Sequence, residues 1–351
     1  MSGYRLMCGC RRLLALGLIA FLLAGAAGAA ERMYAVQVPV ADRSSPARAE
    51  ALRQAMQQLL VRVTGERDAA RLVGIEPLLA QPEQYVQQFR YLDAGPAAGA
   101  ALELNVHFDG TAVERVLRAN GLPVWGRERP PLLLWLAVGG DQRRLIGADS
   151  DHPLYATARR VARERGLTLL FPLLDLEDQA RVGYADVWGG FEETVLAASQ
   201  RYRAQLVLQG RLQAGAGGWR GRWTLHLGRD RLDWDSVGNT AAAALAQGLH
   251  LAADRLALRL AVRALGTAEQ VERIRIRGVA SLEDYARALE YLAQLTPVRD
   301  VEVLAVEGDA LDLLLALDGD RQTLERLLDI GRVLARDPAA PGEAAYRLTA
   351  P

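Results

Sequence analysis

Acidic side chains and a histidine gather in the segment GGDQRRLIGADSDHP, residues 139–153, directly after a continuously apolar run. Asp149, Asp151 and His152 lie within four positions of one another, just before Pro153. Two carboxylates and an imidazole at this spacing could hold a divalent cation or perform acid–base chemistry. The same residue types cap helices, so a structural loop is the alternative, with Asp151 as the cap of a helix that begins at Pro153. A third interpretation is a contact site for a protein partner.

A second acidic group follows the next apolar run, where Asp175 and Glu177 belong to the sequence DLED. If both loops lie at one sheet edge, they could share a cation; a solvated turn is the alternative. Trp188 then stands on a glycine-rich approach to a helix, in the sequence DVWGG. It either plugs the sheet edge or stacks on a ligand. A pocket lined by Trp188 would indicate recognition of a small molecule or glycan.

Several catalytic chemistries are excluded by the composition. The chain has no lysine, which excludes a P-loop lysine and Schiff-base chemistry. Its two cysteines, Cys8 and Cys10, fall in the N-terminal segment, and no serine stands in a G-x-S-x-G setting. We therefore expect no catalytic residue, no cofactor and no metal site, and a protein that is not an enzyme.

The first 29 residues predict a secretory signal peptide. Arginines precede the apolar run Leu13–Leu23, and small residues lead to Ala29, near which we expect cleavage. An uncleaved anchor is the alternative. Three of the 42 arginines and none of the 42 acids precede that site, which leaves 39 basic and 42 acidic residues in a periplasmic protein. This small charge predicts no affinity for nucleic acid or for an anionic membrane. We also expect no transmembrane span after cleavage of the signal peptide.

The elements that position the candidate residues form one predicted βαβ unit, residues 129–174. A strand over 132–138, a helix over 153–165 and a strand over 167–174 follow from apolar runs, a proline at the helix start and Gly166 at its end. Open α/β sheets bind ligands beyond the carboxyl ends of their strands, so the loop 139–151 is the first place to look for function.

Three domains are expected, and the fold class is α/β and α+β. The N-terminal one, residues 30–121, is a small βαβα module with helical pieces at 77–80 and 83–92. A proline-rich linker over 122–131 leads to an α/β middle domain over 132–266, in which tryptophans of a hairpin either face a partner or pack under a helix over 240–264. The last domain, 267–351, has the βαββαβ order of ferredoxin-like folds.

Four sequence segments, in this order along the chain, resemble the bacterial domain-of-unknown-function 2066 family, DUF2066. They are YAVQVPVADRSSPARAEALRQAM, VRVTGER, YVQQFRY and FDGTAVERVLRANGLPVWGRERPPLLLWLA. The resemblance implies an exported proteobacterial protein and supplies no catalytic residues. At the level of fold, the first two domains look like envelope proteins that join a small α+β domain to a TolB-N-terminal-like α/β domain. That likeness favours protein binding.

We therefore expect a periplasmic, non-enzymatic protein that binds another envelope protein or serves as an assembly module. The alternative is a cation-dependent enzyme, or a small-molecule or glycan-binding module, that uses the acidic loops at the sheet edge. The contact residues expected in either case are Asp149, Asp151, His152, Asp175, Glu177 and Trp188.

Overall fold

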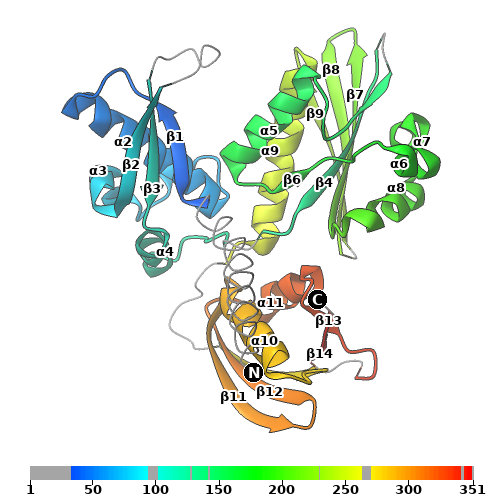
Figure 1. Ribbon diagram of the computed structural model, residues 1–351. Coiled ribbons are helices and arrows are strands. Elements are labelled where there is room, and N and C mark those ends of the chain that lie inside the picture. Colours follow the sequence, from blue (N-terminus) through cyan, green and yellow to red (C-terminus); the bar gives the residue numbers. More distant parts are fainter. Residues whose placement is uncertain are drawn as a thin grey trace, which may run out of the picture. The chain divides into compact units, whose positions relative to one another are not determined.

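The computed structural model has a mixed α/β fold with three sheets, which confirms the predicted fold class (Figure 1). It describes residues 33–93, 102–126, 129–140, 143–228, 230–262, 270–340 and 344–349. The predicted signal peptide lies outside these residues. Contacts divide the chain into two compact units, residues 1–59 with 76–113, and residues 60–75 with 114–351. Among the described residues, no helix has the length and apolarity needed to cross a membrane.

The first unit is built on a three-stranded antiparallel sheet in the order β1-β3-β2. Its apolar face carries Val36 and Val38 of β1 beside Leu104 and Val106 of β3, all fully buried. The elements in this part of the chain are β1 (Ala35–Pro39), α2 (Ser45–Thr64), α3 (Glu76–Ala80), β2 (Val86–Asp93), β3 (Leu102–Phe108) and α4 (Gly110–Ala119).

Strand β2 corrects the predicted helix over residues 83–92. Phe89 and Tyr91 are two residues apart, so in a strand they share one face, and their rings meet edge to face with centroids 6.0 Å apart. Arg48 and Arg43 place their guanidinium groups 5.6 and 5.5 Å from these two rings. Pairing with β3 and this cation–π cover stabilise a strand in a segment whose polar residues had suggested a helix.

The second unit contains the middle sheet, in the order β5-β4-β7-β8-β9, with the two-residue β6 also paired to β4. Strand β4 is buried along its whole length and runs parallel to β6 and β7, whereas β7, β8 and β9 form an antiparallel meander. The strands are β4 (Leu132–Val138), β5 (Arg144–Ile146), β6 (Leu169–Leu170), β7 (Leu206–Gly215), β8 (Gly218–Leu227) and β9 (Asp230–Gly238).

Helices cover both faces of the middle sheet (Figure 1). Helices α5 and α9 pack on one face, where Leu132, Leu134 and Trp223 are buried. Helices α6, α7 and α8 lie on the other face, over Leu133 and Trp135. The helix bounds are α5 (Pro153–Arg165), α6 (Leu176–Arg181), α7 (Tyr184–Gly189), α8 (Glu192–Ser199) and α9 (Ala241–Leu260).

Trp223 of the hairpin packs under α9, as one of the two predicted alternatives had it. Its ring is fully buried, its Nε1 donates to Ser236 Oγ at 2.8 Å, and a Cβ added at Gly248 of α9 would lie 2.1 Å from the ring. The glycine lets the helix approach the tryptophan closely.

The C-terminal part of the second unit has a five-stranded sheet in the order β11-β12-β10-β14-β13. The βαββα order matches the ferredoxin-like pattern, but β14 pairs with β10 in parallel and a short extra strand, β13, forms the outer edge. The elements are β10 (Gln270–Arg277), α10 (Leu282–Gln294), β11 (Val298–Glu307), β12 (Ala310–Leu317), α11 (Arg321–Ile330), β13 (Leu334–Arg336) and β14 (Ala345–Leu348).

Two buried arginines hold the segment that enters the middle sheet. The guanidinium group of Arg129 lies 3.9 Å from the centre of the Trp125 ring and donates to the carbonyl oxygens of Arg62, Trp125, Gly126, Arg165 and Gly166. Arg165 is 1 % exposed and donates to Gly65 O and Asp254 Oδ1, both at 2.7 Å. The segment expected as a linker is therefore packed where it is described, and its Arg129 satisfies carbonyl oxygens at the ends of α2 and α5.

Candidate ligand-binding groove

The first predicted candidate, the segment 139–151, contains a short strand in place of a plain loop. Strand β5 pairs antiparallel with the end of β4. Asp149 and Asp151 are exposed, and the cap of α5 is His152, not Asp151 as expected: His152 Nδ1 accepts from the backbone N–H of Leu154 at 3.2 Å. Burial, and then the charge of Arg144, lower the pKa of His152. A neutral imidazole suits the acceptor role.

The second predicted candidate is an acidic cluster held by one arginine. Asp175 caps α6 through the backbone N–H of Asp178 at 3.0 Å and accepts a bidentate pair of hydrogen bonds from Arg201 at 2.7 and 2.9 Å. Arg201 also lies 3.0 Å from Asp178 and 3.5 Å from Glu177. These contacts, led by the hydrogen bond from Arg201, lower the pKa of Asp175 to about 2. The positive charge that these carboxylates need is therefore already supplied by Arg201.

The two acidic loops do not form a joint cation site. Within the described parts of the chain, no group of three His, Cys, Asp or Glu side chains is placed to hold a metal ion. Asp149 and Asp151 are exposed, while Asp175 and Glu177 turn to Arg201. The structure thus explains Asp175 and His152 by helix capping and Glu177 by ion pairing.

Trp188, the remaining candidate, lies at the carboxyl end of β4. A Cβ added at Gly139, the residue after β4, would lie 2.4 Å from the Trp188 ring, so the ring packs against this backbone. Tyr184 stacks on Trp188 with ring centroids 5.5 Å apart. The helix that carries both residues starts where Gly183 N–H donates to Asp186 at 2.7 Å and ends at Gly190, which has φ of 79°. Trp188 is half-buried, so it both plugs the sheet edge and offers ring surface.

Beside Trp188, arginines form a row on the open part of the sheet. Trp188, Arg211, Gln213, Arg220 and Arg222 line a cavity of about 300 Å³, and no acidic residue is among the lining residues. The strand register places Arg211 of β7 directly opposite Arg222 of β8, and Gln213 opposite Arg220. Like charges at directly opposed positions repel, and an anion between them would relieve the repulsion.

Only part of this positive charge is compensated. Arg222 lies 3.5 Å from Asp235 of β9, and Arg211 donates to the carbonyl oxygen of Trp188 at 2.5 Å. Arg220 is exposed and forms no ion pair within the described residues. The pKa of Arg211 is lowered, first by burial and then by the charge of Arg222. A cavity lined by guanidinium groups that lack carboxylates is suited to carboxylate or phosphate oxygens.

A second cavity, of about 230 Å³, continues the first along the same strands. Arg211 and Arg222 line both cavities, and Gln209, Thr224 and Arg231 are among the residues that line the second. We call the two together the Trp188 groove. Here the charges are paired: Arg231 lies 2.9 Å from Glu192, and Thr224 donates to Asp233 at 2.7 Å.

Gln209 is a buried polar residue with an unused acceptor in the Trp188 groove. Its Nε2 donates to the carbonyl oxygen of Val187 at 3.0 Å, its side chain is 5 % exposed, and its Oε1 has no hydrogen-bond partner. A buried polar atom without a partner costs free energy, and a ligand that donates a hydrogen bond would remove this cost.

The topology explains why the Trp188 groove lies here. Strand β4 has β6 on one side and β7 on the other, and the chain reaches β6 through α5 on one face and β7 through α6–α8 on the opposite face. This is the switch point of an open α/β sheet, where a crevice opens beyond the carboxyl ends of the strands. Gly139 N–H donates to Leu212 O at 2.8 Å, which places the ends of β4 and β7 side by side.

The candidates expected from the sequence are the acidic residues, His152 and Trp188 near this sheet edge, and the arginines of β7 and β8 were not among them. Arg211 with Gln213, and Arg220 with Arg222, are each two residues apart on predicted strands, which is the spacing of one sheet face. The spacing alone therefore predicts that the two members of each pair share a sheet face. Whether one pair lies opposite the other depends on the register of the hairpin formed by β7 and β8.

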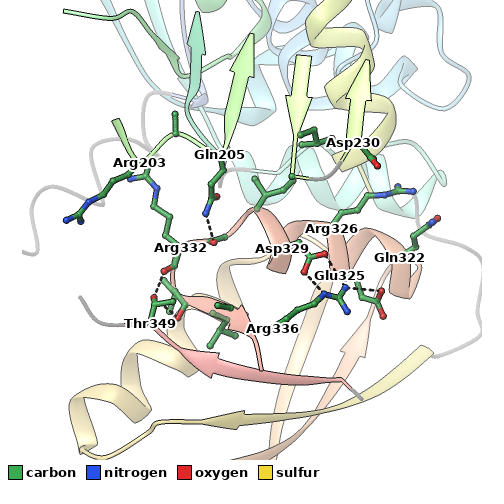
Figure 2. A pocket seen from close by; sticks show the side chains of 18 of the residues that line it. Arg203, Gln205, Asp230, Gln322, Glu325, Arg326, Asp329, Arg332, Arg336 and Thr349 are labelled. Atoms are coloured by element: carbon green, nitrogen blue, oxygen red, sulfur yellow. Dashed lines mark hydrogen bonds and ion pairs between the residues drawn. The ribbon is translucent and has the colours of Figure 1, made fainter. Parts of the chain in front are cut away.

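A larger cleft of about 1170 Å³ lies elsewhere in the second unit, lined by the start of β7, the end of β8, α11 and β13 (Figure 2). Part of its charge is paired: Arg336 lies 2.7 Å from Asp329 and 3.4 Å from Glu325. Gln205 Nε2 donates to Gly331 O at 2.8 Å across the cleft. We favour the Trp188 groove as the functional site because it lies at the switch point of the sheet and contains the buried, unpartnered acceptor of Gln209.

Comparison with known families corrects the resemblance to DUF2066. The family model that matches is Domain of unknown function (DUF8605), over residues 27–126. Three of the four quoted segments lie wholly inside this span, so what they match is the model of a different family of unknown function. No curated protein matches the chain.

One solved structure matches, the crystal structure of TolB from Acinetobacter baumannii. The identity is 12 % and the TM-score is 0.23, with 55 % of this chain and 37 % of that chain covered. The chain therefore spans well under half the length of that protein, and the likeness is too weak to inform function.

Proposed function

We propose that this chain is an exported, non-enzymatic binding protein of the cell envelope, and that its middle domain holds an anionic group of another envelope component in the Trp188 groove. One observation carries the proposal: Trp188, Arg211, Arg220 and Arg222 line a concave site at the switch point of the sheet, with more positive than negative charge.

The absence of an enzymatic role is part of the proposal and rests on the sequence. The chain lacks lysine, and both cysteines precede the expected cleavage site near Ala29. Among the predicted candidates, His152 and Asp175 act as helix caps, and Asp175 and Glu177 pair with Arg201. Export is supported by the N-terminal arginines followed by the apolar run.

Site-specific photocrosslinking in cells tests the binding role. A photoreactive amino acid in place of Gln213, at the rim of the Trp188 groove, is compared with one in place of Arg160, an exposed residue of α5 on the other face of the sheet. We expect an adduct from position 213 that is lost when Arg220→Ser is added, and none from position 160. Equal adducts at both positions, or an adduct that persists without Arg220, would contradict the proposal.

Cell fractionation tests the export role. We expect the full-length chain to yield a protein shortened by about 29 residues that is released with the periplasmic contents. Retention of the tagged protein in the cytoplasm at full length would refute this part of the proposal.

A further inference from the structure

We propose that the ligand of the Trp188 groove is the free carboxyl terminus of a partner polypeptide, bound in extended conformation along β7 and β8. This inference deepens the proposed function and depends on it. Three features of the groove support it: its uncompensated positive charge lies at one end, a buried acceptor lies at the other end, and the spacing between them matches an extended chain.

The first feature is the uneven distribution of charge. At the Gln213 end, Arg211, Arg220 and Arg222 line the cavity, and among these three only Arg222 forms an ion pair within the described residues. At the other end, Arg231 is paired with Glu192. A ligand that carries its charge at one end and is neutral behind it fits this arrangement. Acidic polysaccharides and polyphosphates repeat their charge along the chain and fit it less well.

The second feature is the acceptor Gln209 Oε1, which is buried and lacks a partner. A peptide offers a backbone N–H behind its terminal carboxylate. The Nε2 of Gln209 is fixed by the carbonyl oxygen of Val187, so the amide orientation is set and the oxygen remains for a donor.

The third feature is the spacing. Gln209, Arg211 and Gln213 lie at every second position of β7, and they line the Trp188 groove in succession. Alternate residues of a strand are about 7 Å apart, so the groove extends over about 13 Å. An extended peptide has the same two-residue repeat, and three or four of its residues span this length. Trp188 supplies an apolar wall beside the arginines for the terminal side chain.

The experiment measures binding of a fluorescein-labelled tetrapeptide, Ala-Ala-Ala-Phe, by fluorescence polarisation with the full exported chain. The same peptide with a C-terminal amide is the matched ligand control, and binding of glucuronic acid is measured separately by isothermal titration calorimetry. We expect the free acid to bind at least tenfold more tightly than the amide. Arg220→Ser should weaken binding of the free acid about tenfold and leave binding of the amide unchanged.

Gln209→Leu separates the two halves of the proposed contact. The substitution should weaken binding of the free acid and of the amide by the same factor, because it removes an acceptor for a backbone N–H and leaves the charge of the groove unchanged. Arg160→Ser, on an exposed helix position, is the matched protein control and should change neither affinity. Unfolding temperatures of all variants are measured alongside, so that a folding defect is recognised.

The outcomes distinguish the inference from the proposed function. Equal affinity of the free acid and the amide overturns the inference. If glucuronic acid binds in an Arg220-dependent manner and the peptide does not, the groove binds anions and the proposed function stands, but the peptide terminus is wrong. If neither binds at millimolar concentration and no Arg220-dependent crosslink forms in cells, both fail.

Discussion

The Trp188 ring lies against the backbone of Gly139, so that a Cβ at Gly139 would come 2.4 Å from ring atom Cη2. This contact joins the helix that carries Trp188 to the carboxyl end of the central strand of the middle sheet. The contact fixes the position of the Trp188 ring, which forms one wall of the Trp188 groove. The guanidinium group of Arg211 donates to the Trp188 carbonyl oxygen, so the position of Arg211 beside the ring is fixed as well.

Gly139→Val should therefore damage the groove. The added side chain cannot fit beside the ring, so Trp188 must move, at a cost of about 1–3 kcal/mol of unfolding free energy. We expect the variant to remain folded but to lose most of its affinity for the groove ligand, measured by fluorescence polarisation and urea unfolding. Gly217→Ala is the matched control, since a Cβ there meets nothing within 4 Å. Unchanged affinity in Gly139→Val would show that the contact does not shape the groove.

The buried Arg165 should be a major contributor to stability. It donates to Asp254 and to the carbonyl oxygens of Gly65 and His250. Its removal leaves the two carbonyl oxygens without this donor and Asp254 with Arg67 as its remaining ion-pair partner. Arg165→Leu should lower the free energy of unfolding by about 3 kcal/mol. Arg67, which reaches the same Asp254 at 2.7 Å from a position 42 % exposed, provides the control. Arg67→Ala should cost under about 1 kcal/mol, and equal losses in urea unfolding would contradict this account.

The elements of the middle domain were largely predictable from local patterns. The apolar run over residues 132–138 and the helix between Pro153 and Gly166 have the bounds that the sequence indicates. Proline and glycine fix these bounds through the backbone, without help from tertiary contacts. Strand β2 was missed because its stability comes from pairing with β3 and from arginines that are distant in sequence.

The arginines of the Trp188 groove were not predicted from the sequence, although the sheet edge beside them was. The switch-point rule located the end of β4, next to which Trp188 lies. Asp151 and His152 were candidates because of their residue types. Either type can cap a helix, and the backbone angles at the start of α5 make His152 the cap. The arginine row depends on register: a shift of one residue between β7 and β8 would remove Arg211 from its place opposite Arg222.

The ion pair of Asp175 with Arg201 gives a prediction about pH. The pKa of Asp175 in the folded protein, about 2, lies below its ordinary value of 3.8, so the pair stabilises the fold above about pH 4, and this contribution is lost as the pH falls towards 2. Arg201→Gln should therefore lower the unfolding temperature more at pH 6 than at pH 2.5. Arg181→Gln, which loses only an exposed pair with Glu177, is the control and should have a small effect at both pH values. A difference for Arg201→Gln that does not change with pH would refute the assignment.

Substitutions of Asp235 and Asp151 test whether the ligand binds at the arginines of the Trp188 groove or at the acidic segment 139–151. Asp235 lies 3.5 Å from Arg222 at the edge of the Trp188 groove, and its charge also raises the pKa of Arg211. Asp235→Asn removes this competing carboxylate and should tighten binding of an anionic ligand by up to about fivefold, the range of an exposed ion pair. Asp151→Asn changes an exposed carboxylate in the segment before α5 and should leave the affinity unchanged. Higher salt should weaken binding in both variants, because the attraction is electrostatic. Weaker binding in Asp235→Asn would contradict an arginine site for the ligand, and a loss confined to Asp151→Asn would place the ligand at the acidic loop.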